Sequence, residues 1–147
     1  MKKILIIIFI GICLIIILNE PKTFYLESKY YGFGELSNIN QVTLNNFIKE
    51  KESFVLYIYG NCVCSTKFNS IIKEFAERNN IVIHTLDSEL VSQTEIDDIK
   101  YFPTIVVFKK GKIVDYLKSD RDDNLIYYES SEEFSKWLTS YININRK

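Results

Sequence analysis

The segment "IKYFPTIVVFKKGK", residues 99 to 112, carries the most specific structural pattern in the chain. Thr104 to Phe108 is a run of β-branched and aromatic residues typical of a buried strand, and Pro103 marks its beginning. The polar turn "KKGK" around Gly111 leads into a second apolar run, "IVDYL", residues 113 to 117. Two such runs joined by a short turn that contains glycine predict a β-hairpin.

A second informative segment, "YGNCVCSTKF", covers residues 59 to 68. Just before it, "SFVLYIYG" is a continuous apolar run, which predicts a strand buried on both faces. From Phe68 to Phe75 apolar residues recur at three- and four-residue spacing, which predicts an amphipathic helix that stops at Asn79 and Asn80. Two cysteines, Cys62 and Cys64, therefore lie where a buried strand gives way to a helix.

The remaining segments continue an alternation of strands and helices. We expect strands at 35–39, at the edge of the sheet, and at 81–87, and an edge strand from "LIYY" at 125–128. We expect a helix capped by Thr43 and a short helix begun by Thr94. The last helix should begin with a capping box of Ser130 and Glu133. This order predicts an α/β fold, with a mixed central sheet and helices on both faces.

In order and spacing, these residues resemble the thioredoxin family over about residues 35 to 145. The match is carried by Phe102, Pro103, Thr104, Phe108 and Gly111, which follow the family's pattern around a cis-proline. Within the superfamily the chain is most similar to membrane-anchored thioredoxin-like accessory proteins of Gram-positive bacteria, of the bacteriocin transport type. The resemblance implies a thioredoxin fold, thiol–disulfide exchange with polypeptides, and no cofactor.

The resemblance also assigns roles to residues. In the family the second cysteine of Cys-x-x-Cys lies three positions before the helix's first core residue, here Phe68, so the motif becomes Cys62-Val63-Cys64-Ser65. Cys62 then holds the nucleophile position, Ser65 the resolving position, and Cys64 is the candidate resolving thiol. The family's cis-proline faces the nucleophile, and the residue before it pairs with an extended substrate.

Applied to this chain, the resemblance implies that Phe102, Pro103 and Thr104 bind the substrate. The pairing would be β-augmentation, in which an extended peptide lines up along an exposed backbone edge.

The chemistry at Cys62 has a basis that is independent of the family. A thiolate at a helix N-terminus is stabilised by unsatisfied N–H groups and by the positive end of the macrodipole. Three interpretations remain open: a strained Cys62–Cys64 disulfide, a single reactive Cys62 to which Ser65 donates a hydrogen bond, and a binding module whose thiols do not turn over.

Several positions depart from the family pattern. Leu56 replaces the buried aspartate that relays protons, Asn61 replaces a tryptophan, and Val63 and Ser65 interrupt the usual dithiol motif. Without the carboxylate, protons for the leaving thiol must come from solvent or another group. We therefore expect the rate of exchange to suffer more than the binding of a substrate.

The N-terminus has a composition of its own. Residues 1–20 hold Lys2 and Lys3 followed by an apolar run from Ile4 to Leu18, about 22 Å long as a helix, without a small-x-small cleavage site after it. We interpret it as an uncleaved membrane anchor with a cytoplasmic N-terminus, a linker at 21–34 and an extracytoplasmic domain at 35–145. If the segment is cleaved, the domain is secreted.

Composition limits the other partners. A net charge of −1 and the lack of a basic patch argue against nucleic acid. Two thiols and an imidazole would suit a soft metal ion, but the chain's one histidine, His84, lies inside a strand pattern typical of a core residue, so we expect no metal. We expect polypeptide thiols or disulfides as partners, together with a recycling partner that the sequence does not identify.

Overall fold

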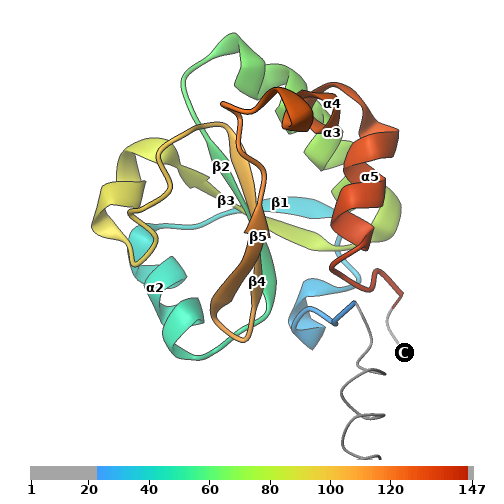
Figure 1. Cartoon of the computed structure of the whole chain (residues 1–147). Coiled ribbons are helices and arrows are strands. Elements are labelled where there is room, and N and C mark those ends of the chain that lie inside the picture. Colours follow the sequence, from blue (N-terminus) through green and yellow to red (C-terminus); the bar gives the residue numbers. More distant parts are fainter. Residues whose placement is uncertain (1–22, 146–147) are drawn as a thin grey trace, which may run out of the picture.

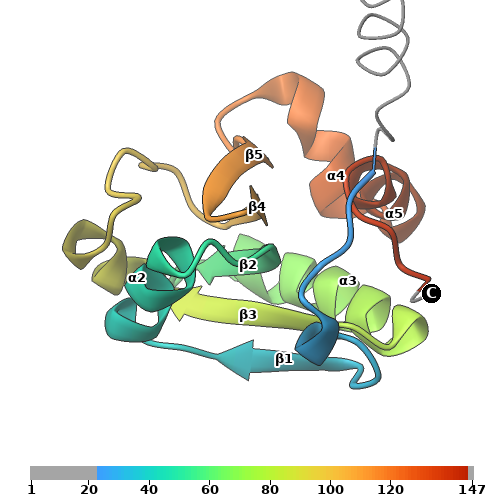
Figure 2. The same ribbon diagram turned by 90° about the horizontal axis from the view of Figure 1, so that it is seen from below.

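A five-stranded mixed sheet forms the centre of the protein, whose computed structural model describes residues 23–145. The strands are β1 (Glu35–Asn38), β2 (Phe54–Tyr59), β3 (Val82–Asp87), β4 (Thr104–Lys109) and β5 (Lys112–Tyr116). They lie in the order β1-β3-β2-β4-β5. The strands β1, β3 and β2 are parallel and lie side by side in Figure 2, whereas β4 and β5 are antiparallel to their neighbours.

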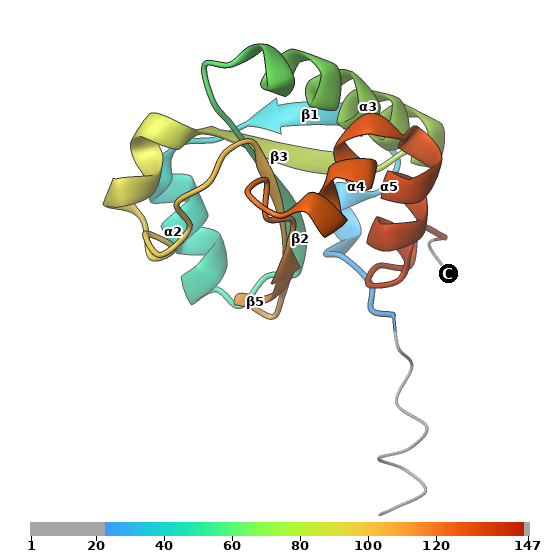
Figure 3. The ribbon, with the colours of Figure 1, turned by 45° about the horizontal axis from the view of Figure 1, so that its top comes forward.

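Helices cover both faces of this sheet (Figure 1). The helices are η1 (Ser28–Tyr30), α2 (Gln41–Lys49), α3 (Val63–Asn79), η2 (Ser88–Gln93), η3 (Asp122–Asn124), α4 (Leu125–Glu129) and α5 (Ser131–Thr139). One face is covered by α2, and the other by α3, α4 and α5 (Figure 3). The expected α/β architecture, with helices on both sides of a mixed sheet, is confirmed.

Aromatic contacts hold the layers together. On the α2 face, Phe47 of α2 meets Phe54 of β2 edge to face, with ring centroids 5.4 Å apart. On the opposite face, the Tyr57 ring meets Phe68 of α3 edge to face, at 5.7 Å. Because neighbouring residues of β2 point to opposite faces and both are fully buried, the prediction of a strand buried on both sides is confirmed.

Two of the predicted helix starts were wrong. The N-cap of α2 is Asn40, not Thr43: the Asn40 side chain accepts a hydrogen bond from the Thr43 backbone N–H at 2.9 Å. No helix begins at Thr94, because the 3₁₀ helix η2 ends just before it and the buried Thr94 hydroxyl donates to the Val91 carbonyl at 2.7 Å, which holds a turn. The Ser130 cap was correct, since its hydroxyl accepts from the Glu133 N–H at 3.3 Å, but the reciprocal bond of a capping box is not formed, because the Ser130 N–H donates to the Ile126 carbonyl.

The "LIYY" segment is helical, not an edge strand. It forms α4, and β5 remains the edge of the sheet on that side. Tertiary contacts account for this difference: the Tyr128 ring lies 4.3 Å from the ring of Phe68 on α3, a position that a strand paired with β5 would not give.

The segment before β1 packs on the domain. Leu26, Tyr30 and Tyr31 are buried in the main core, and Phe24 forms a parallel bridge with Ile142 near the C-terminus. Packing therefore begins within the stretch that the sequence assigns to a linker. The proposed anchor at residues 1–20 lies outside the described residues, and within residues 23–145 none of the helices has both the length and the apolar character to cross a membrane.

Candidate functional site

Cys62 lies at the N-cap of α3, directly after the loop that follows β2. Its backbone is extended, with φ −126° and ψ 158°, and the residue is exposed to solvent. The first turn of α3 contains no acidic residue, so the positive end of its macrodipole is not offset there. The structure therefore places a sulfur atom at the start of a 17-residue helix, as the sequence predicts.

The Cys62 sulfur is disulfide-bonded. The chain's other cysteines are Cys13 and Cys64. Residue 13 and the Cys64 side chain both lie outside the described part of the structure, although the Cys64 backbone belongs to the first turn of α3. The bridge between Cys62 and Cys64 therefore stays a prediction, as do the roles of both thiols.

Ser65, in the first turn of α3, contacts the loop that carries Cys62. Its side chain is 7% exposed, and its hydroxyl oxygen lies 3.4 Å from the Cys62 sulfur. The same oxygen accepts a hydrogen bond from the Gly60 backbone N–H at 3.2 Å. The Ser65 carbonyl accepts from the Tyr57 hydroxyl at 3.1 Å, and burial raises the pKa of Tyr57 to about 12, so this phenol stays protonated. Ser65 thus links the strand, the loop and the sulfur.

The peptide bond between Phe102 and Pro103 is cis, as the resemblance implied. In the antiparallel pairing of β2 with β4, Thr104 lies opposite Ile58, which places Phe102 opposite Gly60. A Cβ atom built on Gly60 would lie 3.5 Å from the Phe102 Cβ. The proline loop and the cysteine loop therefore meet at the same end of the sheet (Figure 3).

The three residues predicted to bind substrate differ in exposure. Phe102 is half-buried, and together with Pro103 it lines a surface pocket. The Thr104 side chain is fully buried and donates to the Leu117 carbonyl at 2.5 Å. The Thr104 hydroxyl thus fixes the start of β4 and does not reach the surface.

Two hollows lie at this end of the sheet, and the first of them borders the cysteine loop. One, of about 350 Å³, is bordered by Cys62, Ser65 and Asn69 on the β2–α3 side. The other, of about 370 Å³, lies between Phe102, Pro103 and the helix α4. The sequence reasoning missed the second hollow, because it treated the segment that forms α4 as an edge strand.

Tyr128 holds α4, which forms one wall of this second hollow, against the loop that contains Pro103. Its hydroxyl lies 3.0 Å from the Pro103 carbonyl oxygen and 3.1 Å from that of Leu117, and can donate to either. Burial raises the pKa of Tyr128 above its ordinary value, so the hydroxyl remains a donor. A buried tyrosine hydroxyl commonly finds a hydrogen-bond partner. The two adjacent tyrosines of "LIYYE" were therefore the signal in the sequence that this segment packs on the domain.

The position of the family's proton-relay aspartate is apolar. Leu56 is fully buried, and its register partner on β3 is His84, which is 5% exposed. Neither imidazole nitrogen of His84 has a hydrogen-bond partner among residues 23–145. Burial lowers the pKa of His84 to about 4, an effect that the nearby Glu52 partly opposes.

His84 belongs to the aromatic core on the α2 face. Its ring lies 4.7 Å from that of Tyr30 and 5.1 Å from that of Phe47. Among the residues that the structure describes, no three His, Cys, Asp or Glu side chains are grouped so that they could hold a metal ion.

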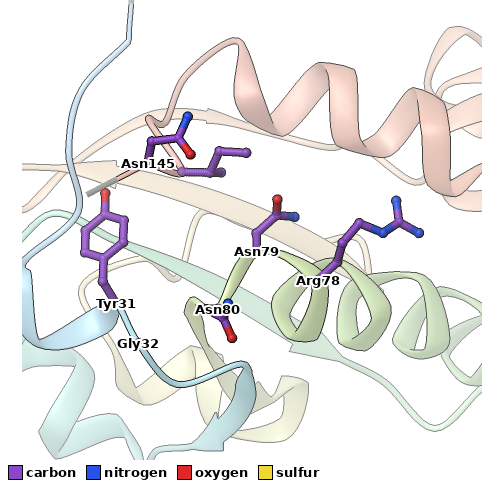
Figure 4. A pocket seen from close by; sticks show the side chains of 7 residues that line it. Tyr31, Gly32, Arg78, Asn79, Asn80 and Asn145 are labelled. Carbon is purple, nitrogen blue, oxygen red and sulfur yellow. The ribbon is translucent and has the colours of Figure 1, made fainter. Parts of the chain in front are cut away.

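A polar pocket of about 410 Å³ lies at the other end of α3 (Figure 4). It is lined by Tyr31, Asn79, Asn80, Asn145 and Arg78, the last of which pairs with Glu74 on its own helix. A 17-residue helix is about 24 Å long, so this pocket is remote from the Cys62 sulfur. Its side chains carry no nucleophile, and we assign it no part in the sulfur chemistry.

Known structures share this fold. A chain from the complex of ferredoxin:thioredoxin reductase with thioredoxin f2 superposes with a TM-score of 0.57 at 18% identity, covering 74% of this chain and 96% of that one. A thioredoxin variant from Halobacterium salinarum gives 0.55 at 15% identity, covering 77% and 96%. Thioredoxin f from spinach chloroplast gives 0.51 at 20% identity, covering 71% and 89%.

Comparison by sequence adds no relative: no family model and no curated protein matches the chain. The structural likeness extends over most of the length of each thioredoxin. At these identities the comparison establishes the architecture alone. The chain has the thioredoxin fold.

Proposed function

We propose that the protein exchanges thiols and disulfides with polypeptide substrates, with Cys62 as nucleophile and Cys64 as resolving thiol. The observation that carries this proposal is the environment of Cys62: an exposed, disulfide-bonded sulfur at the N-terminus of a long helix, within reach of the Ser65 hydroxyl. Helix N–H groups favour the thiolate over the thiol, and the thiolate is the attacking form. Ser65 adds a hydrogen-bond donor for that thiolate.

In the reducing direction, the Cys62 thiolate attacks one sulfur of a substrate disulfide. A bond forms between the two sulfur atoms, and the second substrate sulfur leaves as a thiolate that takes a proton from solvent. Cys64 then attacks the Cys62 sulfur, which forms the Cys62–Cys64 disulfide and releases the first substrate thiol. Two electrons pass from the protein to the substrate, and an external dithiol must return them. The reverse sequence oxidises a substrate dithiol.

We further propose that the chain works at the outer face of a cytoplasmic membrane, with its first 20 residues as anchor. Support comes from the sequence: Lys2 and Lys3 precede a long apolar run, and disulfide chemistry is favoured outside the reducing cytosol. We also propose kinship with the membrane-anchored accessory proteins of Gram-positive bacteria, on the basis of the strand that leads into the cysteine motif and the Lys67–Phe68 pair that follows it. Intact-mass measurement of the mature protein tests whether the segment is retained, since cleavage would remove its mass.

Thiol trapping tests the redox role. We expect the full-length protein with Cys13→Ala to bind two equivalents of an alkylating reagent after reduction and none after oxidation. Cys62→Ala should abolish reduction of a model disulfide such as insulin, whereas Cys64→Ala should retain the first attack and accumulate a mixed disulfide. Unchanged insulin reduction by Cys62→Ala would refute the proposal.

A non-catalytic binding module of an export or envelope complex is the second candidate. Serine at the resolving position and Leu56 in place of the relay carboxylate both favour it, since neither change affects a groove beside Pro103. This role predicts peptide binding that Cys62→Ala leaves intact, without measurable disulfide reduction by the unmodified protein.

A further inference from the structure

The pocket beside α4 has walls from four separate parts of the chain, namely α3, the loop before β4, the loop after β5 and α4 itself. Lys67 comes from α3, Phe102 and Pro103 come from the loop before β4, and Leu125 and Glu129 come from α4. Ser119 and Tyr128 complete its lining. It therefore forms only because α4 folds back against the proline loop.

This pocket is held in place before any ligand arrives. The Tyr128 hydroxyl lies within hydrogen-bond distance of the Pro103 and Leu117 carbonyl oxygens and can donate to either, and its ring packs on Phe68, which is fully buried. A wall fixed both to the core and to the proline loop costs little conformational entropy when a ligand binds.

The size and chemistry of the pocket limit its occupant. A volume of about 370 Å³ is near the lower end for ligand sites, which favours one side chain over a nucleotide or a large cofactor. Phe102, Pro103, Leu125 and the Tyr128 ring supply apolar surface, and the rim carries one cation, Lys67, and one anion, Glu129. Because these opposite charges cancel, the pocket favours an uncharged apolar side chain.

Its position relates it to the reactive sulfur. Phe102 contributes to the pocket and also lies opposite Gly60, at the start of the loop that carries Cys62. An extended peptide that pairs with the Phe102 backbone turns alternate side chains to the same face. A side chain about two positions from the substrate cysteine can therefore enter the pocket while that cysteine lies at Cys62.

We propose that this pocket, with Leu125 as its outer wall, selects polypeptides that carry a large apolar side chain about two residues from the reacting cysteine. The proposal deepens the proposed function and rests on it for the identity of the substrate. It assigns α4 a role in specificity that the cysteine motif alone does not supply.

Binding of redox-inert peptides tests this proposal without turnover. We would titrate the full-length protein with two short extended peptides in which serine replaces the cysteine, flanked at about two positions on each side by leucine or by serine. The leucine peptide should bind about tenfold more tightly than the serine peptide. Leu125→Ser should remove most of that preference.

Val114→Ser is the matched control, because Val114 on β5 is 44% exposed and Leu125 is 45% exposed. This control should keep the tenfold preference. Equal binding of the two peptides, or equal losses in both variants, would overturn the pocket. A leucine preference that depends on Leu125, found together with failed insulin reduction, would support the pocket and refute the redox function alone.

Discussion

Replacing His84 by leucine should make the protein more resistant to acid. The histidine is buried between Tyr30, Phe47 and Phe54, and neither ring nitrogen is hydrogen-bonded within residues 23–145. Charged or polar groups near the ring are Lys29 and Tyr30 from η1, Glu52 from the loop before β2, and the backbone of Ser37 on β1, which with Glu52 opposes the effect of burial on the pKa of the ring. Because burial is the dominant influence, the folded state holds the imidazole neutral.

The magnitude follows from the shift in pKa. In the folded protein the pKa of His84 is lowered to about 4, against 6.5 for an exposed histidine. The unfolded chain therefore binds a proton first, and the stability that the neutral ring provides is complete above pH ~6.5 and is lost as pH falls from there to about 4. A difference of about 2.5 units corresponds to roughly 3 kcal/mol in the free energy of unfolding.

Guanidinium unfolding of the wild-type protein and His84→Leu at pH 7.5, 5.5 and 4 would measure this loss. Carboxylates that titrate in the same range affect both proteins, so they cancel in the difference between them. We expect that difference to change by about 3 kcal/mol in favour of the variant between pH 7.5 and 4, with most of the change below pH 6.5. Parallel pH profiles for the two proteins would refute the reasoning.

Three further predictions concern the site and its support. Ser65→Ala should slow alkylation of the reduced Cys62 thiol about fivefold, since it removes one hydrogen bond worth about 1 kcal/mol. Ser65→Thr keeps the hydroxyl and should retain the rate. Equal rates for the wild-type protein and both variants would exclude the hydrogen bond. Tyr128→Phe should lower the free energy of unfolding by about 1 kcal/mol in denaturant titrations, because the hydrogen bond from its hydroxyl to the Pro103 or the Leu117 carbonyl oxygen is lost, whereas Tyr101→Phe, at a residue that is 56% exposed, should change nothing measurable. Gly111→Ala should lower the free energy of unfolding by more than about 2 kcal/mol, because φ is +72° and the new Cβ would lie 2.3 Å from the Ile48 carbonyl oxygen. Gly32→Ala should cost less, since Gly32 has φ +94° but open space around it. Equal losses in the two variants would contradict the steric argument.

Much of the fold was readable from local patterns. The strand at 54–59 and the helix at 63–79 have strong periodicity and clear stops, and Asn80 ends the helix in the left-handed conformation, at φ 50°. The cis bond before Pro103 followed from the resemblance and its spacing. These features depend on residues close in sequence, which explains why the sequence predicts them.

The errors lie where distant contacts decide between local alternatives. Four consecutive apolar and aromatic residues at 125–128 have neither a helical nor a strand period, and the packing of Tyr128 on Phe68 makes them helical. Asn40 and Thr43 are both residue types that cap helices, and the backbone conformation at the start of α2 decides that Asn40 is the N-cap. The α4 pocket was missed for the same reason, because its walls come together only in the folded chain.

The pairing of Phe24 with Ile142 has a consequence for orientation. The Phe24 N–H donates to the Tyr141 carbonyl at 2.9 Å, and shortly afterwards Tyr31 bridges to Ile81, just past the C-terminal end of α3. The chain thus enters the domain at the end of α3 opposite Cys62, about 24 Å away along the helix. If the preceding residues hold the protein in a bilayer, Cys62 lies at the end of the domain that is far from the lipid.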